Sequence, residues 1–300
     1  MAKILLIETS GPTLSVAIAD GGHVLAERVC REPRMQASLT APLVKEVLDA
    51  VELSVSDCDA VCVSKGPGSY TGLRVGVSTA NGLAFGAGIP LLAVGTLDIL
   101  AYSAIGTQDI LAASVFGIGS VKVTEPVPPE APQGQICGIG SVGFSEPIPK
   151  YVVPMIDARR MEVYTAVYGP SKAQQTTGER LMNGEQPSTG KGQLVHEQLS
   201  DGERVGWERL TDVEAKVIGP DSFAEYLAQG PVLFIGDGAL KCKDVITHPN
   251  AVFRDATPLA SAMAPLAEQA FNSGRFEDLA YFEPFYLKDF VAAAPKVHGL

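Results

Sequence analysis

The chain has 300 residues, enough for one large domain or two of ordinary size, and carries a net charge of −11. An acidic balance argues against independent nucleic-acid binding, because contacts to phosphates need a basic face. No apolar run reaches the ~18 residues of a membrane-spanning helix, and the apolar run after Met1 meets Glu8 too early for a signal peptide. The five cysteines show no CxxC spacing, so we expect reduced thiols and a cytoplasmic location, without disulfides or a zinc site.

Hydrophobic patterning predicts an alternation of strands and helices in the first third of the chain. Apolar runs of strand length are typical of buried strands, and apolar residues three or four apart predict helices. In chain order, the elements are strands at Lys3–Thr9, Thr13–Ala19 and His23–Val29, a helix at Ser38–Leu53, a strand at Ala60–Ser64, a helix at Tyr70–Phe85, a strand at Pro90–Val94 and a helix at Leu97–Ile105. This order, βββαβαβα, predicts an α/β fold in which helices cover the faces of a mixed sheet.

A glycine-rich loop, S-K-G-P-G-S-Y-T-G-L-R-V-G at Ser64–Gly76, joins a predicted strand to the helix that follows it. It does not fit the phosphate-binding pattern G-x-x-x-x-G-K-[ST], which would need a lysine near Leu73. A proline fixes the backbone, and the serine or threonine after it can cap the helix. The loop residues of interest are Gly66, Pro67, Gly68, Ser69, Tyr70, Thr71, Gly72 and Arg74.

The helix after this loop is rich in small residues. Each glycine costs a helix ~1 kcal/mol against alanine, so the small side chains should allow another backbone to approach closely. Two interpretations stay open: packing inside the helix's own domain, or an interface with a second subunit, flanked by Leu43 and Val47 of the preceding helix. The small residues are Gly72, Gly76, Ser78, Ala80, Gly82, Ala84 and Gly86.

The element order, with the turn Glu8-Thr9-Ser10 after the first strand, resembles the ribonuclease-H-like core of the actin, hexokinase and Hsp70 ATPases. Those proteins grip phosphates between two turns and hold adenosine with a glycine pair. The second turn would lie near Asp157, where Met161 replaces the expected glycine. Gly236 and Gly238 resemble the adenosine element. The resemblance implies a degenerate nucleotide site with no expected cofactor; weak ATP or ADP binding stays open, and polar capping of strand ends is the alternative role for Glu8 and Asp157.

Four longer motifs carry a closer resemblance, to the TsaB, or YeaZ, family of tRNA threonylcarbamoyladenosine biosynthesis proteins. They are I-L-L-I-E-T-S at Ile4–Ser10, K-G-P-G-S-Y-T-G-L-R-V-G at Lys65–Gly76, I-D-A-R-R-M-E-V-Y at Ile156–Tyr164 and P-F-Y-L-K-D at Pro284–Asp289. The resemblance implies a two-domain fold of the actin, hexokinase and Hsp70 type. Residues 1–106 would form a ribonuclease-H-like domain with the dimerisation helices, and residues 107–300 a degenerate second one with insertions at about 107–150 and 172–208.

The resemblance implies a cytoplasmic scaffold subunit with no catalytic residues of its own. Family members act with a catalytic relative, TsaD, and an ATPase, TsaE, when threonylcarbamoyl is transferred to N6 of adenosine 37 in tRNAs that read ANN codons. The resemblance further implies a homodimer when the chain is alone, and a complex with TsaD through the same helices. Contact with tRNA would be indirect, through the complex, and no membrane contact is expected.

Loss of two histidines bears on metal binding. TsaD carries a His-Met-Glu-Gly-His motif, whose two histidines suit a metal ion. The matching stretch here, Thr96–Leu100, reads T-L-D-I-L, so no metal site is expected. Two other functions stay open as alternatives. An ATP-dependent small-molecule kinase would need an intact second phosphate turn, and a glycoprotease-like peptidase would need a nucleophile with a histidine, or an H-E-x-x-H motif.

Two further sequence features are less specific: a repeated phrase and a pair of arginines. The phrase G-I-G-S-V-x-x-x-E-P-x-P occurs at residues 117–128 and again at 138–149. The second copy fits the dinucleotide pattern G-x-G-x-x-G, but its prolines forbid the helix that this pattern requires, so we interpret the pair as a duplicated insertion of unassigned role. Arg159 and Arg160 would either face the tRNA or acyl-adenylate side of a complex or form solvated salt bridges.

Overall fold

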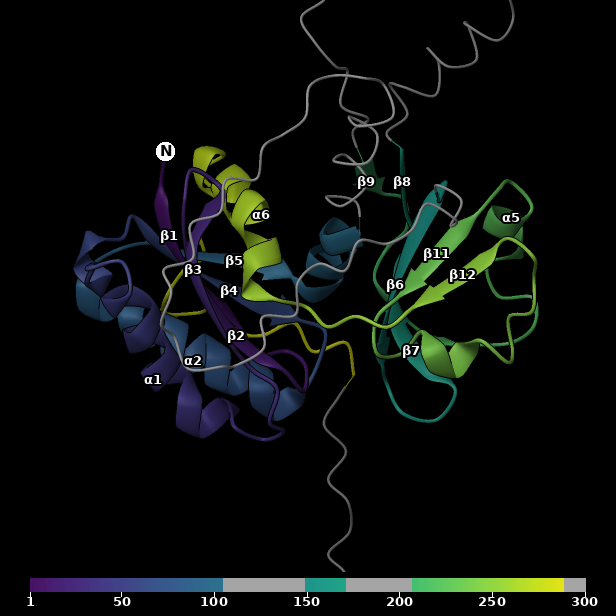
Figure 1. Cartoon of the computed structure of the whole chain (residues 1–300), viewed down its shortest axis with the longest axis horizontal. Helices are drawn as coiled ribbons and strands as arrows, with labels where there is room; N and C mark the ends of the chain where they lie inside the picture. Colours follow the sequence, from purple (N-terminus) through teal and green to yellow (C-terminus); the bar gives the residue numbers. More distant parts are fainter. Residues whose placement is uncertain (105–148, 171–206, 289–300) are drawn as a thin grey trace, which may run out of the picture.

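The computed structural model describes residues 1–104, 149–170 and 207–288, and these form two sheet-containing halves (Figure 1). The first sheet has the order β3-β2-β1-β4-β5, in which β1 pairs antiparallel with β2 and parallel with β4. Its strands are β1 (Lys3–Glu8), β2 (Leu14–Asp20), β3 (His23–Cys30), β4 (Ala60–Gly66) and β5 (Leu91–Gly95). The predicted order of strands and helices is confirmed in this half, including a helix over residues 96–104.

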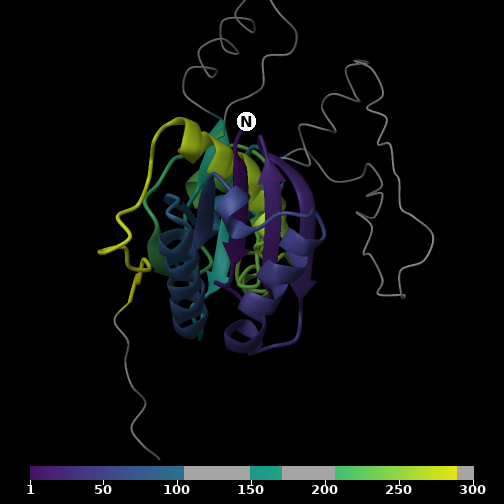
Figure 2. The ribbon, with the colours of Figure 1, turned by 90° about the vertical axis from the view of Figure 1, so that its left-hand side faces the viewer.

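Helices cover both faces of the first sheet. On one face, α1 (Gln36–Asp49) and α2 (Tyr70–Ala87) bury apolar side chains against β1, β2 and β4; Figure 2 shows this face toward the viewer. On the other face, α6 (Ala260–Asn272) buries Met263 and four alanines against β1, β2 and β5. Helix α6 comes from the part of the chain that the sequence division assigned to the second domain, so that division does not hold for this helix.

The second sheet is also mixed. Its main order is β10-β7-β6-β11-β12, and β8 extends it by pairing with β6 and β9. Its elements are β6 (Tyr151–Asp157), β7 (Glu162–Thr165), β8 (Tyr168–Pro170), β9 (Trp207–Arg209), β10 (Glu214–Val217), α5 (Ala224–Leu227), β11 (Val232–Ile235) and β12 (Ala251–Arg254). A core around Val153 and Phe234 fills one side of this sheet.

The helix over residues 96–104 joins the two halves. Its apolar face packs on β6, β8 and β11 of the second sheet in one buried cluster. At the edge of this cluster the Tyr168 hydroxyl donates to Asp98 Oδ1 at 2.6 Å, and Arg209 lies 3.7 Å from the same oxygen. Burial, followed by the Asp98 charge, raises the pKa of Tyr168 above its usual range. The joint is therefore apolar at its centre and closed by a polar contact.

The largest difference from a predicted boundary is at the end of α1, which lies at Asp49 and not at Leu53. Beyond the helix, Glu52 takes a φ of 56°, and Leu53 N–H donates back to the Leu48 carbonyl at 3.0 Å, which turns the chain. Most of both predicted insertions, and almost all of the repeated G-I-G-S-V phrase, lie outside the described residues. None of the helices in the described ranges is long and apolar enough to cross a membrane.

Candidate functional site

The turn after β1 is closed. Glu8 and Thr9 have no exposed surface, and Ser10 is 2% exposed. The Ser10 backbone N–H, which a phosphate grip would offer to its ligand, donates instead to Glu8 Oε1 at 2.6 Å. Burial raises the pKa of Glu8 to about 7, against the opposing hydrogen bond from the Ser10 backbone N–H. This turn therefore has the geometry of a buried polar cap.

The glycine-rich loop seals this turn from outside. A β-carbon on Gly68 would collide with the Ser10 carbonyl oxygen, and one on Gly72 with the Thr9 carbonyl oxygen. Between these two contacts, Ser69 N–H donates to the Ser10 carbonyl at 2.6 Å, and the Ser69 hydroxyl caps α2 by accepting from Gly72 N–H. The glycines are thus needed because two backbone segments touch, and the predicted serine cap is confirmed.

The proposed interface on the small-residue face of α2 is corrected by this packing. Gly76 lies against the Thr9 side chain, and Ala80 has no exposed surface. Leu43 and Val47 of α1 belong to the same buried core, with exposed fractions of 8% and 0%. All four residues pack inside their own half: Gly76 and Ala80 lie on the face of α2 turned toward β1 and β4, and Leu43 and Val47 of α1 join the same core. They are not available to a second subunit.

A different face of α2 is open. Five exposed residues recur at intervals of three or four and so form one stripe: Thr71, Arg74, Ser78, Gly82 and Phe85; Gly86, next to Phe85, is exposed as well. Phe85 is 79% exposed, and a β-carbon on Gly82 would meet nothing within 4 Å. The helical period of 3.6 residues that predicts α2 also predicts this stripe. Small residues occur on both faces of the helix, however, so the sequence alone does not show which face is buried.

A C-terminal strap, residues 284–288, crosses the outside of the loop. Phe285 N–H donates to the Lys65 carbonyl at 2.7 Å, and its own carbonyl lies where a side chain on Gly66 would project. Gly66 also has a φ of 107°, which L side chains rarely adopt. The Tyr286 ring packs on the Tyr70 ring at a centroid distance of 4.9 Å. The loop is therefore held between the β1 turn and the strap, and no local pattern in the sequence predicts this contact.

The corresponding turn of the second half, after β6, is more exposed and is held by charges. Asp157 Oδ1 accepts from Arg159 N–H at 2.8 Å and pairs with Lys241, whose ammonium also donates to the Glu162 carbonyl at 2.7 Å. Burial works to raise the pKa of Asp157, but the hydrogen bonds from Lys241 and Arg159 and their charges outweigh it and lower the pKa. Asp157 N–H donates to Asp237 Oδ1 at 3.0 Å.

The two glycines assigned to an adenosine element have a nearer structural reason. A β-carbon on Gly236 would collide with the Met155 carbonyl oxygen, and Gly238 N–H donates to the same oxygen at 3.0 Å. Both glycines therefore let the chain after β11 pass close to β6. At the position of the expected phosphate-turn glycine, the Met161 carbonyl accepts from Ile218 N–H at 2.8 Å.

Buried polar atoms without hydrogen-bond partners gather around the first turn. Several buried oxygens have no hydrogen-bond partner: Glu8 Oε2, Thr9 Oγ1, Ser10 Oγ, Ser64 Oγ and Thr96 Oγ1. They lie at or just after the carboxyl ends of β1, β4 and β5, the edge at which α/β proteins bind ligands, but the turn is buried. Within the described ranges, no three histidine, cysteine or acidic side chains are grouped to hold a metal.

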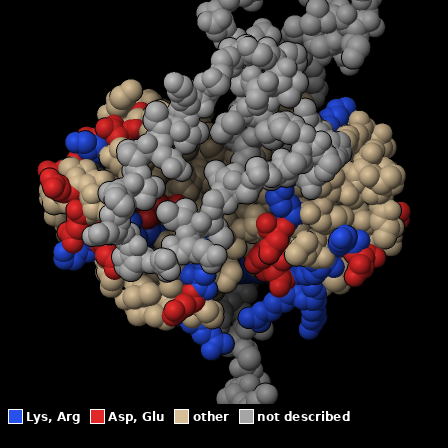
Figure 3. Space-filling model, viewed as in Figure 1, with Lys and Arg blue, Asp and Glu red and all other residues tan. Residues whose placement is uncertain are grey.

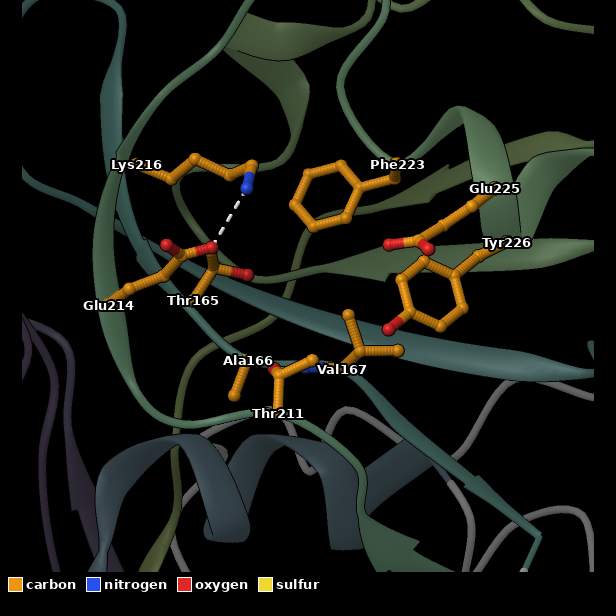
Figure 4. A pocket seen from close by; sticks show the side chains of 9 residues that line it. All are labelled: Thr165, Ala166, Val167, Thr211, Glu214, Lys216, Phe223, Glu225 and Tyr226. Carbon is orange, nitrogen blue, oxygen red and sulfur yellow. Dashed lines mark hydrogen bonds and ion pairs between the residues drawn. The ribbon is translucent and has the colours of Figure 1, made fainter.

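A small pocket lies elsewhere, between β7, β10 and α5 of the second half (Figure 4). It has a volume of about 130 Å³, and its lining includes Lys216, Glu214 and Glu225. The Lys216 ammonium pairs with Glu214 at 2.8 Å and lies 5.3 Å from the Phe223 ring centre, so its charge is already satisfied. None of the site residues expected from the sequence lines this pocket.

Comparison with known proteins gives a consistent picture. The model of the family described as "TsaD: tRNA N6-adenosine threonylcarbamoyltransferase" matches residues 34–115. The Escherichia coli "tRNA threonylcarbamoyladenosine biosynthesis protein TsaB" is 29% identical over 97% of this chain and 96% of its own length. The Bacillus subtilis protein of that name is 38% identical over 33% of this chain and 43% of its own length.

A solved structure shows the same fold. "YeaZ from Pseudomonas aeruginosa" matches with a TM-score of 0.64 at 22% identity, over 96% of this chain and the whole of that one. The matched fold spans both halves, whereas the sequence matches at 35% and 38% identity cover about a third of the chain. Along nearly its whole length, the chain is therefore similar in sequence to a protein named TsaB and in fold to one named YeaZ.

Proposed function

We propose that the chain is a non-catalytic scaffold subunit in the formation of threonylcarbamoyladenosine in tRNA. It acts in the cytoplasm with a TsaD-type transferase and a TsaE-type ATPase, which together transfer threonylcarbamoyl to N6 of adenosine 37 in tRNAs that read ANN codons. The observation that carries this proposal is the match to E. coli TsaB along 97% of the chain.

The site supports a scaffold over the kinase alternative. A kinase needs an open phosphate grip, whereas the turn at Glu8–Ser10 is buried and its Ser10 N–H is already bonded. We interpret the two halves as a degenerate form of the two-domain ATPase fold of actin, hexokinase and Hsp70, with Asp157 reduced to a cap for the hairpin after β6. No observation in the described residues favours the peptidase alternative.

The outward stripe of α2 is the proposed association surface. It replaces the inward face named from the sequence, and we propose that a second copy of the chain and the TsaD-type partner compete for it. Gly82 and Ser78 would let a partner helix come close, and Phe85, 79% exposed, supplies the apolar contact. Aromatic and arginine side chains such as Phe85 and Arg74 are also enriched in protein interfaces.

Reconstitution tests this function. Purified transferase, ATPase, the synthase of the threonylcarbamoyl adenylate, tRNA, threonine, bicarbonate and ATP are combined with and without this chain, and modified adenosine is measured by mass spectrometry. We expect product only with the chain present, and none when the transferase is omitted. Product formed at the full rate without the chain would contradict the proposal.

The same assay tests the association surface. Phe85→Asp should abolish the homodimer and the transferase complex in sedimentation, together with product, while the folded monomer keeps its thermal stability. Tyr281→Asp is the matched control, because Tyr281 is 83% exposed and lies outside α2. A Phe85→Asp variant that still dimerises and supports full modification would place the interface elsewhere.

A further inference from the structure

The hairpin between β6 and β7 places two arginines in an unfavourable backbone conformation. Arg159 and Arg160 follow each other with φ values of 70° and 53°. Turns that need two consecutive positive φ values are normally built from Asn and Gly, since a β-carbon opposes this conformation. Two arginines at these positions therefore lower the stability of the turn, and such strain is typical of residues whose side chains have a function.

The hairpin is braced so that its tip has a fixed shape. Glu162 N–H donates to the Arg159 carbonyl at 3.2 Å, and Ala158 N–H donates to the Glu162 carbonyl at 3.1 Å. Lys241 pairs with Asp157 from one side, and Lys288 of the C-terminal strap pairs with the Glu162 carboxylate from the other. The two carboxylates of the hairpin are thus neutralised by lysines from other parts of the chain.

The guanidinium groups of Arg159 and Arg160 take no part in these ion pairs. Both arginines are exposed, and among the described residues neither side chain forms an ion pair or a hydrogen bond. The solvated salt bridges that the sequence left open are therefore not formed within these ranges. Figure 3 shows Lys and Arg side chains gathered at the lower edge of the second half, where Figure 1 draws this hairpin. The chain has a net charge of −11, so two adjacent, exposed positive charges at this tip differ from its overall charge.

We propose that the Arg159–Arg160 tip contacts phosphates of the tRNA backbone when the chain works within its complex; this inference rests on the proposed function. Guanidinium groups bind phosphate oxygens through paired, charge-assisted hydrogen bonds, and two adjacent groups on a fixed turn give a defined contact. Residues 157–162 include no aromatic side chain of the kind that anchors protein interfaces. Phosphate is therefore favoured over an acidic protein surface as the partner.

The test compares tRNA binding by the assembled complex at several salt concentrations. Arg159→Gly/Arg160→Gly removes both charges and also suits the backbone of the turn, so the melting temperature should stay the same or rise. We expect the affinity for an unmodified ANN-reading tRNA transcript at ~100 mM salt to fall roughly tenfold, and the slope of log affinity against log salt to fall by about 1 to 2. Arg31→Gly/Arg275→Gly is the control, because it removes two exposed arginines of the first half.

The outcomes separate this inference from the proposed function. An unchanged affinity and salt slope, in a complex that still modifies tRNA, would overturn the inference alone. Loss of the transferase subunit from the variant complex with an unchanged salt slope would show that the tip meets a protein. A wild-type complex that neither binds nor modifies tRNA would overturn the proposed function as well.

Discussion

Glu8 and Asp157 each end the strand at the centre of their sheet, yet their surroundings are opposite. Glu8 has no exposed surface and its pKa is raised to about 7, whereas the Asp157 side chain is 48% exposed and its pKa is lowered. A phosphate grip would need both turns open, with backbone N–H groups turned toward the ligand. Here the first turn is sealed by a glycine-rich loop and the second is tied by Lys241. The contrast indicates that the first turn is part of a closed core, while the second lies at an exposed, charged surface.

The largest expected effect comes from breaking the seal over the first turn. Gly72→Ala should lower the free energy of unfolding by about 3 kcal/mol, since its β-carbon would meet the Thr9 backbone, which cannot move aside cheaply. Gly82→Ala, on the open side of the same helix, should raise stability by up to ~1 kcal/mol. Urea denaturation of both variants measures the difference. Equal effects would show that α2 does not press on the β1 turn.

The protonation of Glu8 gives the next effect. Its pKa rises from 4.5 unfolded to about 7 folded, so the folded state binds more protons within that window and stability falls as pH rises through it. The expected loss from this group is about 3 kcal/mol between pH ~5 and ~8. Glu8→Gln should remove that part of the pH dependence and be more stable than wild type at pH ~8. Parallel curves for the two proteins would mean that Glu8 is already charged in the fold.

The smallest effect is expected at the second turn. Lys241→Gln should cost about 1 kcal/mol or less at neutral pH, because solvent screens a half-exposed Asp157. Since the pKa of Asp157 is lowered, the stability from this pair is present above the ordinary pKa of aspartate and is lost as pH falls through the folded value. Lys243→Gln is the control, an exposed lysine two residues away with no ion pair in the described ranges. A deficit of Lys241→Gln that persists unchanged in acid would exclude the pair as its cause.

Local patterning predicted the elements of the first half, because continuous apolar runs and the 3.6-residue period fix strands and helices within a few residues. The inward face of α2 was not predictable in the same way: Gly76 and Gly82 look alike in sequence, and only the position of Thr9 separates them. The roles of Gly236 and Gly238 were obscured for a similar reason, since a glycine pair suits a close ligand and a close strand equally. In both examples, the role of the glycine depends on a contact with a segment far away in the sequence.

Helix α6 has a consequence for how the protein is made. A ribosome that has released the first 106 residues has made all five strands of the first sheet, but nothing of the helix that covers the second face of that sheet. Ile4, Leu6, Cys62 and Leu92 stay without that cover until α6, Ala260–Asn272, emerges. Domains usually fold in the order of synthesis, but here the half that is synthesised first is completed last.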